Sequence, residues 1–197
     1  MIAAVVQEDL VRRHRLTVQD YYRMAEVGLL APDARVELIE GEIIDMPPSG
    51  IPHAGILTRL MRLLLAAAGT RVTVRMQLPL RLDDYSEPEP DFAVLRWRED
   101  DYTSAHPLPG DTLLVIEVSQ SSLRYDRNRK LPLYARHGIP EVWIVDLVSL
   151  RLHTFDLPQD GQYVNSSTTP RPGSLTMKAP PGLQVDLTGL FTGLQGS

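Results

Sequence analysis

Three short apolar runs and one helical segment in the middle of the chain limit its fold more than any other feature. The runs cover residues 90–95, 113–118 and 142–146, and they are rich in β-branched and aromatic side chains. Residues 126–138, between the second and third runs, mix polar and apolar side chains with helical periodicity. This order predicts strand, strand, helix, strand, which is an α/β arrangement.

Two of these runs carry a lone carboxylate in or beside apolar sequence, Asp91 and Glu117. An ionised carboxylate that is buried without a partner is strongly destabilising, so each needs a cation, hydrogen bonds or a raised pKa. We interpret the pair as ligands of a divalent metal at the end of the sheet, with Lys130 reaching the same place from the helix. Simpler roles stay open for each residue alone: a turn cap at Asp91, a core arginine partner for Glu117, and solvent exposure for Lys130.

Length and composition set outer limits on the protein. The 197 residues suit one domain with a substantial core, so we expect a single domain over 1–197 with its core at about 17–191. The absence of cysteine excludes disulfides, thiolate metal sites and cysteine nucleophiles, which leaves oxygen and imidazole as metal ligands. We find neither a signal-peptide core nor an apolar run approaching a membrane span, and therefore expect a cytoplasmic protein without a membrane partner.

The charge distribution is uneven along the chain. A net charge of −5 argues against general affinity for nucleic acid, but residues 56–82 hold five arginines and no acid, and residues 123–138 are also basic. Solvated helix and strand faces would explain such runs, yet their place beside the carboxylate strands suits contact with phosphate. The candidate phosphate contacts are His53, Arg59, Arg62, Arg124 and Arg127.

Lys130 is unusual because arginine supplies nearly all of the positive charge. Of the 20 basic residues 18 are arginine, and Lys178 is the other lysine. Lysine is a compact ammonium whose pKa falls when it is desolvated, as a water-activating residue requires. Asp126, Lys130 and Tyr134 follow one another at i, i+4 spacing and share one helix face. The alternative for Lys130 is a surface pair with Asp126.

The remaining elements follow from periodicity and from the residues that break it. We predict a helix that begins after Thr17 and ends near Gly28, two strands joined at Gly41, and a helix over 53–68 that Gly69 ends. We also predict strands over 70–82, 141–146 and 150–155, hairpin loops and short edge strands over 158–182, and two apolar segments, 185–187 and 190–191, that pack back on the body.

Taken together, several segments resemble the bacterial Uma-two family of the PD-(D/E)XK nuclease superfamily. The matching segments are 36–43, 89–92, 114–119, 126–130 with Tyr134, and 138–146. The resemblance implies a restriction-endonuclease-like core with a central mixed β-sheet flanked by helices. It also implies cleavage of phosphodiester bonds with Mg²⁺ or Mn²⁺, with Glu37, Asp91 and Glu117 as metal-binding, catalytic acids and Lys130 as the catalytic lysine.

One departure from the superfamily pattern is Ser119, which stands two residues after Glu117 where that pattern has lysine. Lys130 on the following helix is the natural replacement. We therefore expect a metal-dependent endonuclease with DNA as its partner. The alternatives are a catalytically silent module of the same fold that binds nucleic acid or a protein, and a structural or self-associating protein; a homodimer stays open.

Overall fold

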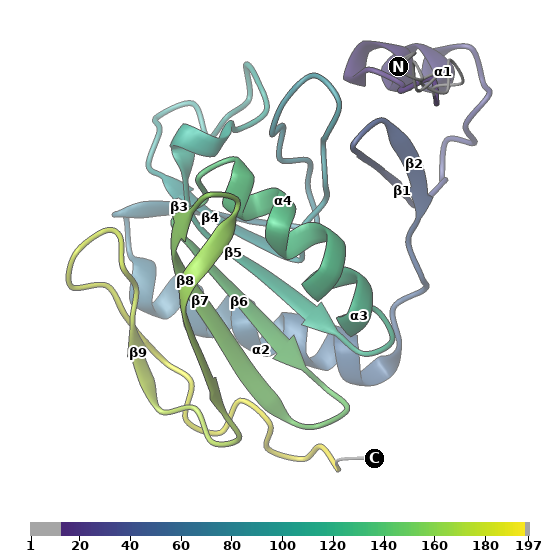
Figure 1. Cartoon of the computed structure of the whole chain (residues 1–197). Helices are drawn as coiled ribbons and strands as arrows, with labels where there is room; N and C mark the ends of the chain where they lie inside the picture. The colour runs from purple at the N-terminus through teal and green to yellow at the C-terminus, as the bar shows by residue number, and fades with distance from the viewer. Residues whose placement is uncertain (1–12, 196–197) are drawn as a thin grey trace, which may run out of the picture.

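A six-stranded mixed sheet forms the centre of the computed structural model, which describes residues 13–195 (Figure 1). Its strands lie in the order β3-β4-β5-β6-β7-β8. Their bounds are β3 Val72–Met76, β4 Phe92–Arg96, β5 Thr112–Ser119, β6 Glu141–Asp146, β7 Arg151–Gln159 and β8 Gln162–Thr169. Only β5 and β6 pair in parallel. The predicted α/β fold with a mixed sheet is confirmed.

Helices cover both faces of this sheet (Figure 1). The helix α2, Ile51–Ala68, packs on one face, and the helical connection between β5 and β6 packs on the other. A parallel pair needs such a crossover, which here consists of α3 Leu123–Tyr125, a π-helical turn η2 Asp126–Lys130, and α4 Leu131–Arg136. Side chains of β5 alternate between the two faces: Ile116 packs toward α2, and Val115 toward α4.

The helix α2 bears on the expectation that no apolar run approaches a membrane span. Its 18 residues are long and apolar enough to cross a membrane by length and composition. One side of the helix, which includes Ile56, Leu60 and Leu64, is buried in the core shared with the sheet. The helix therefore has the place of a core helix in this fold.

The N-terminal elements confirm the predicted hairpin. Helix α1, Val18–Glu26, begins at a capping box formed by Thr17 and Asp20. Strands β1, Val36–Ile39, and β2, Glu42–Asp45, pair antiparallel. The turn between them has φ values of 52° at Glu40 and 83° at Gly41, and a Cβ at Gly41 would lie 2.6 Å from the Cβ of Arg15. Glycine is therefore required there.

The strand predicted over 70–82 is too long. β3 ends at Met76, because the next residue, Gln77, has a φ of 50° and turns the chain away while its N–H bonds to the carbonyl of Asp91. Pro79 then removes a donor that a ladder would need. The apolar alternation of this stretch reflects Leu80 and Leu82, which are buried in the core under α4 without forming a strand.

The C-terminal segment packs back on the body as predicted. A 3₁₀ turn, η1 Pro109–Asp111, directly precedes β5. The last two strands of the chain are β9, Ser174–Thr176, and β10, Gln184–Asp186. They form a two-stranded antiparallel sheet. Val185, Leu187 and Leu190 are buried in the same core as α2. The C-terminal segment therefore covers the α2 side of the sheet, although it lies far from α2 along the chain.

A buried histidine on β7 gives the fold a predictable dependence on pH. Burial lowers the pKa of His153 from 6.5, and Arg127 adds to this effect. As the pH falls, His153 therefore takes up a proton more readily in the unfolded chain than in the folded one. The free energy of unfolding consequently falls as the pH drops below 6.5. We expect His153→Gln to remove part of this loss, as measured by urea unfolding between about pH 7 and pH 5. An unchanged pH profile would contradict the assignment.

Candidate active site

Asp91 and Glu117 lie side by side at the same end of two neighbouring central strands, β4 and β5. Asp91 directly precedes β4, and the β4–β5 register pairs Phe92 with Ile116. Continuing this ladder by one step places Asp91 opposite Glu117. Residues opposite each other in an antiparallel ladder share a face, and here it is the face that α4 covers. The structure therefore brings together the two carboxylates that the sequence singled out.

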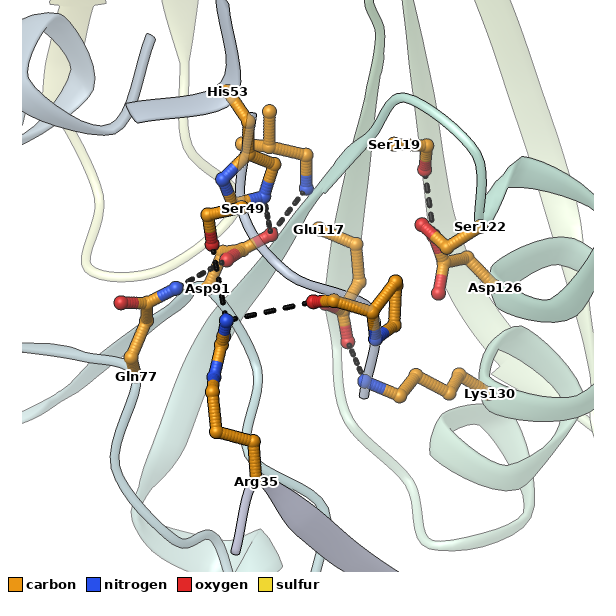
Figure 2. A network of polar contacts seen from close by, with 12 residues as sticks. Arg35, Ser49, His53, Gln77, Asp91, Glu117, Ser119, Ser122, Asp126 and Lys130 are labelled. Carbon is orange, nitrogen blue, oxygen red and sulfur yellow. Dashed lines mark hydrogen bonds and ion pairs between the residues drawn. The ribbon is translucent and has the colours of Figure 1, made fainter. Parts of the chain in front are cut away.

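Asp91 is held by a network of hydrogen bonds from three directions (Figure 2). The N–H of Val118 donates to Oδ2 at 2.8 Å, and Nε2 of Gln77 donates to Oδ1 at 3.2 Å. Nε2 of His53, in the first turn of α2, lies 3.2 Å from Oδ2. This hydrogen bond raises the pKa of His53 against the opposing effect of burial. Asp91 is thus a fixed member of a network and more than a turn cap.

Glu117 belongs to a second, buried network centred on Lys130. Nζ of Lys130 lies 3.2 Å from Oε1 of Glu117 and 3.0 Å from Oε2 of Glu37. The hydroxyl of Tyr134 donates to the same Glu117 oxygen at 2.6 Å, and the N–H of Glu89 donates to Oε2 of Glu37 at 3.1 Å. Lys130 is only 5% exposed. Two of the simpler roles considered from the sequence are therefore wrong: Lys130 is not solvent exposed, and the partner of Glu117 is not a core arginine.

Burial and neighbouring charges shift the protonation of this network. Burial raises the pKa of Glu117 to about 8, Lys130 opposes this shift, and nearby carboxylates including Asp91 and Glu37 add to it. Burial acts to lower the pKa of Lys130, but its ion pairs with Glu117 and Glu37 outweigh burial and raise that pKa well above 10.5. The lowered lysine pKa expected for a water-activating base is therefore wrong for this arrangement. The two ion pairs favour the ammonium form of Lys130.

Asp126 has a structural task that explains the serine at position 119. The hydroxyls of Ser119 and Ser122 both donate to its Oδ2, each at 2.7 Å. These bonds tie the end of β5 to the start of the helical connection. The side chain two residues after Glu117 is therefore used for fixing the loop, and the predicted alternative of a surface pair between Asp126 and Lys130 is wrong.

The helical connection contains a π-helical turn that ends at Lys130. The N–H of Leu131 bonds to the carbonyl of Asp126, five residues earlier. Pro132 follows at once, and in a regular helix its ring would clash with the carbonyl four residues before it. A wider turn relieves this clash. The turn separates the part of the helix that contacts Ser119 from the part that presents Lys130 and Tyr134 to Glu117.

A cavity of about 560 Å³ opens beside both networks. It is lined by all five of the predicted residues that the structure brings together, namely Glu37, His53, Asp91, Glu117 and Lys130. Its volume lies within the range of about 300–1,000 Å³ that ligand sites occupy. Further lining residues are Arg35, Gln77, Glu89, Gln120, Ser122 and Tyr125.

The four arginines predicted to contact phosphate do not line this cavity. Arg59 on α2 donates to the backbone carbonyls of Gly189 and Thr192, at 3.2 and 3.0 Å, and so anchors the C-terminal segment. Arg62, Arg124 and Arg127 are exposed on the outer surfaces of their helices. Basic composition near the carboxylate strands was therefore a poor guide to which cations reach the site.

Sequence reasoning missed Arg35, an exposed cation that also lines the cavity. Its NH1 lies 3.4 Å from the carbonyl of Pro47 and 3.5 Å from Oγ of Ser49, and its guanidinium is exposed (Figure 2). A signal was present, because Arg35 stands two residues before Glu37, and side chains at i and i+2 of an extended chain share a side. Gln77 and Glu89 gave no comparable signal.

The chemistry of the lining residues fits a hard divalent cation. Across the described range 13–195, no three Asp, Glu or His side chains gather closely enough to cage a metal. Mg²⁺ needs only one or two carboxylates when water and phosphate supply its other ligands. Asp91 and Glu117 provide two, and Glu117 accepts both of its recorded side-chain bonds at Oε1. Glu37 has the same arrangement, since Lys130 and the N–H of Glu89 both bond to its Oε2, and its part as a third metal ligand stays a prediction.

Comparison with known proteins supports the same fold. One similar solved structure is described as the crystal structure of a putative nuclease belonging to DUF820 from Anabaena variabilis ATCC 29413. It is 19% identical to this chain with a TM-score of 0.63, over 82% of this chain and 88% of that one. None of the curated proteins compared with the chain matches it. The family model Uma2, described as "Putative restriction endonuclease", matches residues 18–188. The chain therefore belongs to the Uma2 family of restriction-endonuclease-like proteins.

Proposed function

We propose that this protein is a metal-dependent nuclease that hydrolyses phosphodiester bonds in DNA. The observation that carries the proposal is the convergence of Asp91, Glu117 and Lys130 on one cavity. Membership of a family described as putative restriction endonucleases supports it. Fold alone does not define a reaction, so the proposal rests on this site.

The proposed roles follow from the contacts of each side chain. Asp91 and Glu117 would hold Mg²⁺ or Mn²⁺, which when bound supplies an activated water and neutralises charge on the phosphate. Lys130, held as an ammonium by its two ion pairs, donates hydrogen bonds toward negative charge that develops beside Glu117. Glu37 positions that ammonium. His53 holds Asp91 in place through the contact between its Nε2 and Oδ2 of Asp91.

A cleavage assay combined with a thermal scan tests this proposal. We expect the wild type to cleave plasmid DNA with Mg²⁺ or Mn²⁺ and to stop when a chelator is present. The same metals should raise the melting temperature, because a ligand that binds only the folded state stabilises it by mass action. Asp91→Asn should lose both effects, whereas Asp33→Asn, at an exposed position outside the cavity, should keep both.

The silent binding module makes the opposite prediction for the same assay. DNA would bind without chelator-sensitive cleavage at any metal concentration, and Asp91→Asn would leave binding intact. A wild type that neither cleaves DNA nor gains stability from metal would overturn the nuclease proposal. Parallel reactions with single-stranded DNA and RNA identify the substrate.

A second prediction concerns Arg35 as the rim contact for phosphate. Arg35→Ala should weaken DNA binding by about ten- to hundred-fold, because a charge-assisted hydrogen bond contributes about 1.5–3 kcal/mol. The slope of the logarithm of affinity against the logarithm of salt should fall by about 1. The matched control is Arg62→Ala, an exposed arginine outside the cavity. A stronger effect at Arg62 would place the DNA along α2 instead.

A further inference from the structure

The strand β3 leaves one edge of the central sheet open. β3 pairs only with β4, and within residues 13–195 the N–H and C=O groups on its outer side have no backbone partner. An open edge of this kind is a template for pairing with another strand. Its sequence, Val72–Met76, lacks proline and carries one charge, at Arg75. These features give β3 little protection against pairing.

Exposed apolar side chains lie at both ends of this edge. Trp97, next to the Val72 end, is 57% exposed, and Leu78, beyond the Met76 end, is 44% exposed. Both line a groove of about 580 Å³ that runs along β3. An antiparallel partner strand would bring the Trp97 end of one chain against the Leu78 end of the other. Both apolar groups would then be covered.

Two charged side chains on this edge are incompletely paired. NH1 of Arg75 is buried and has no hydrogen-bond partner among the described residues. Asp101, which is exposed, accepts a hydrogen bond of 3.4 Å from the hydroxyl of Thr73. The acid therefore sits beside position 73, two residues along the strand from the arginine. Arg75 and Thr73 share one face of β3.

We propose that the protein forms a two-fold symmetric homodimer in which β3 pairs antiparallel with β3 of a second copy. Electrostatics select a register centred on Val74. Centring on Thr73 would oppose Arg71 to Arg75, and centring on Arg75 would oppose two copies of that arginine. Like charges directly opposite each other are destabilising.

The register centred on Val74 pairs all five residues of β3. It sets Thr73 of each chain opposite Arg75 of its partner. Because Asp101 contacts Thr73, each Arg75 then meets Asp101 of the other chain, which gives two symmetry-related ion pairs. The interface ends one residue before Gln77, whose amide donates to Asp91. The dimer does not depend on whether the protein is a nuclease.

Two charge-reversal variants test this interface, because each should weaken the dimer alone and the two should restore it when mixed. Arg75→Asp and Asp101→Arg should each weaken the dimer about ten-fold or more, because each creates like-charge contacts. An equimolar mixture of the two variants should dimerise again, since each chain then offers the complement of the other. Sedimentation velocity measures the association, and circular dichroism confirms that each variant is folded. Failure of the mixture to associate would overturn the proposed register.

A disulfide trap gives an independent readout. The chain has no cysteine, so Val74→Cys introduces a single thiol. Opposite residues in an antiparallel ladder have Cα atoms about 4.5–5.5 Å apart, which suits a disulfide. We expect covalent dimers of Val74→Cys under mild oxidation, and none for Ser166→Cys on the other edge strand, β8. A wild type that is monomeric at all micromolar concentrations, or equal cross-linking of both variants, would overturn the proposal.

Discussion

Lys130→Met is expected to lower the free energy of unfolding by about 3–5 kcal/mol, as removal of one partner from a buried ion pair does. The loss arises because Glu37 and Glu117, 3.0 and 3.2 Å from Nζ of Lys130, would stay buried without their cation, so that each must either keep an uncompensated charge or take up a proton. Methionine keeps most of the side-chain volume, so packing contributes little. Urea unfolding at about pH 8 measures the effect.

The pH dependence of this variant has a definite sign. Burial already raises the pKa of Glu117 to about 8 with Lys130 present, and without the ammonium that pKa rises further. A raised folded-state pKa gives stability at low pH that is lost as the pH rises. The deficit of Lys130→Met should therefore shrink as the pH falls. Adding Glu117→Gln should also recover part of it.

Lys178 provides the matched control, because it is the other lysine of the chain. Its side chain is 56% exposed and lies 3.2 Å from Asp156. Exposed pairs contribute about 0–1 kcal/mol, so Lys178→Met should have little effect on stability. Equal losses for the two variants would mean that Lys130 does not compensate buried charge.

Glu117→Gln is expected to reduce cleavage about a hundred-fold or more while changing the free energy of unfolding by only about 1 kcal/mol. The metal and the transition state lose a full negative charge. The fold loses less, because Lys130 keeps its ion pair with Glu37 and the amide carbonyl still accepts from Tyr134. Initial cleavage rates with Mg²⁺ and denaturant unfolding without metal separate the two effects.

Glu141 is a suitable control for this substitution. It is also a buried glutamate on a central strand, where it accepts from Nε1 of Trp143 and from the N–H of Lys178. It does not line the cavity. Glu141→Gln should therefore keep the cleavage rate of the wild type. If both variants lost activity equally, the loss would reflect the fold and would exclude a specific role for Glu117.

The local part of this architecture was predictable from sequence. Strand runs such as 142–146 and the breaker Gly41 act over a few residues, where periodicity and backbone preference decide the structure. The pairing of Asp91 with Glu117 also followed, because both interrupt apolar strands and a buried carboxylate requires a partner. Lys130 was found through its rarity in a chain rich in arginine.

The long-range part was not predictable from periodicity. Glu37 contacts Lys130 only because a hairpin outside the main sheet docks through the Leu38–Glu87 bridge onto the segment before β4. No local pattern encodes such docking. Arg59 shows the opposite failure, since a cation that looked free is used by carbonyls 130 and 133 residues away along the chain. Which charges are free depends on tertiary contacts.

The π-helical turn makes the helix tolerant of substitution but sensitive to length. Each residue of an α-helix rotates the chain by roughly 100°, so removing Asn128 would convert the wide turn into a regular one and swing the two halves against each other. Asp126 and Lys130 could then no longer meet Ser119 and Glu117 at once. Deletion of Asn128 should therefore break either the bond of Asp126 to Ser119 or the ion pair of Lys130 with Glu117. The substitution Asn128→Ala, at an exposed position, should preserve both contacts.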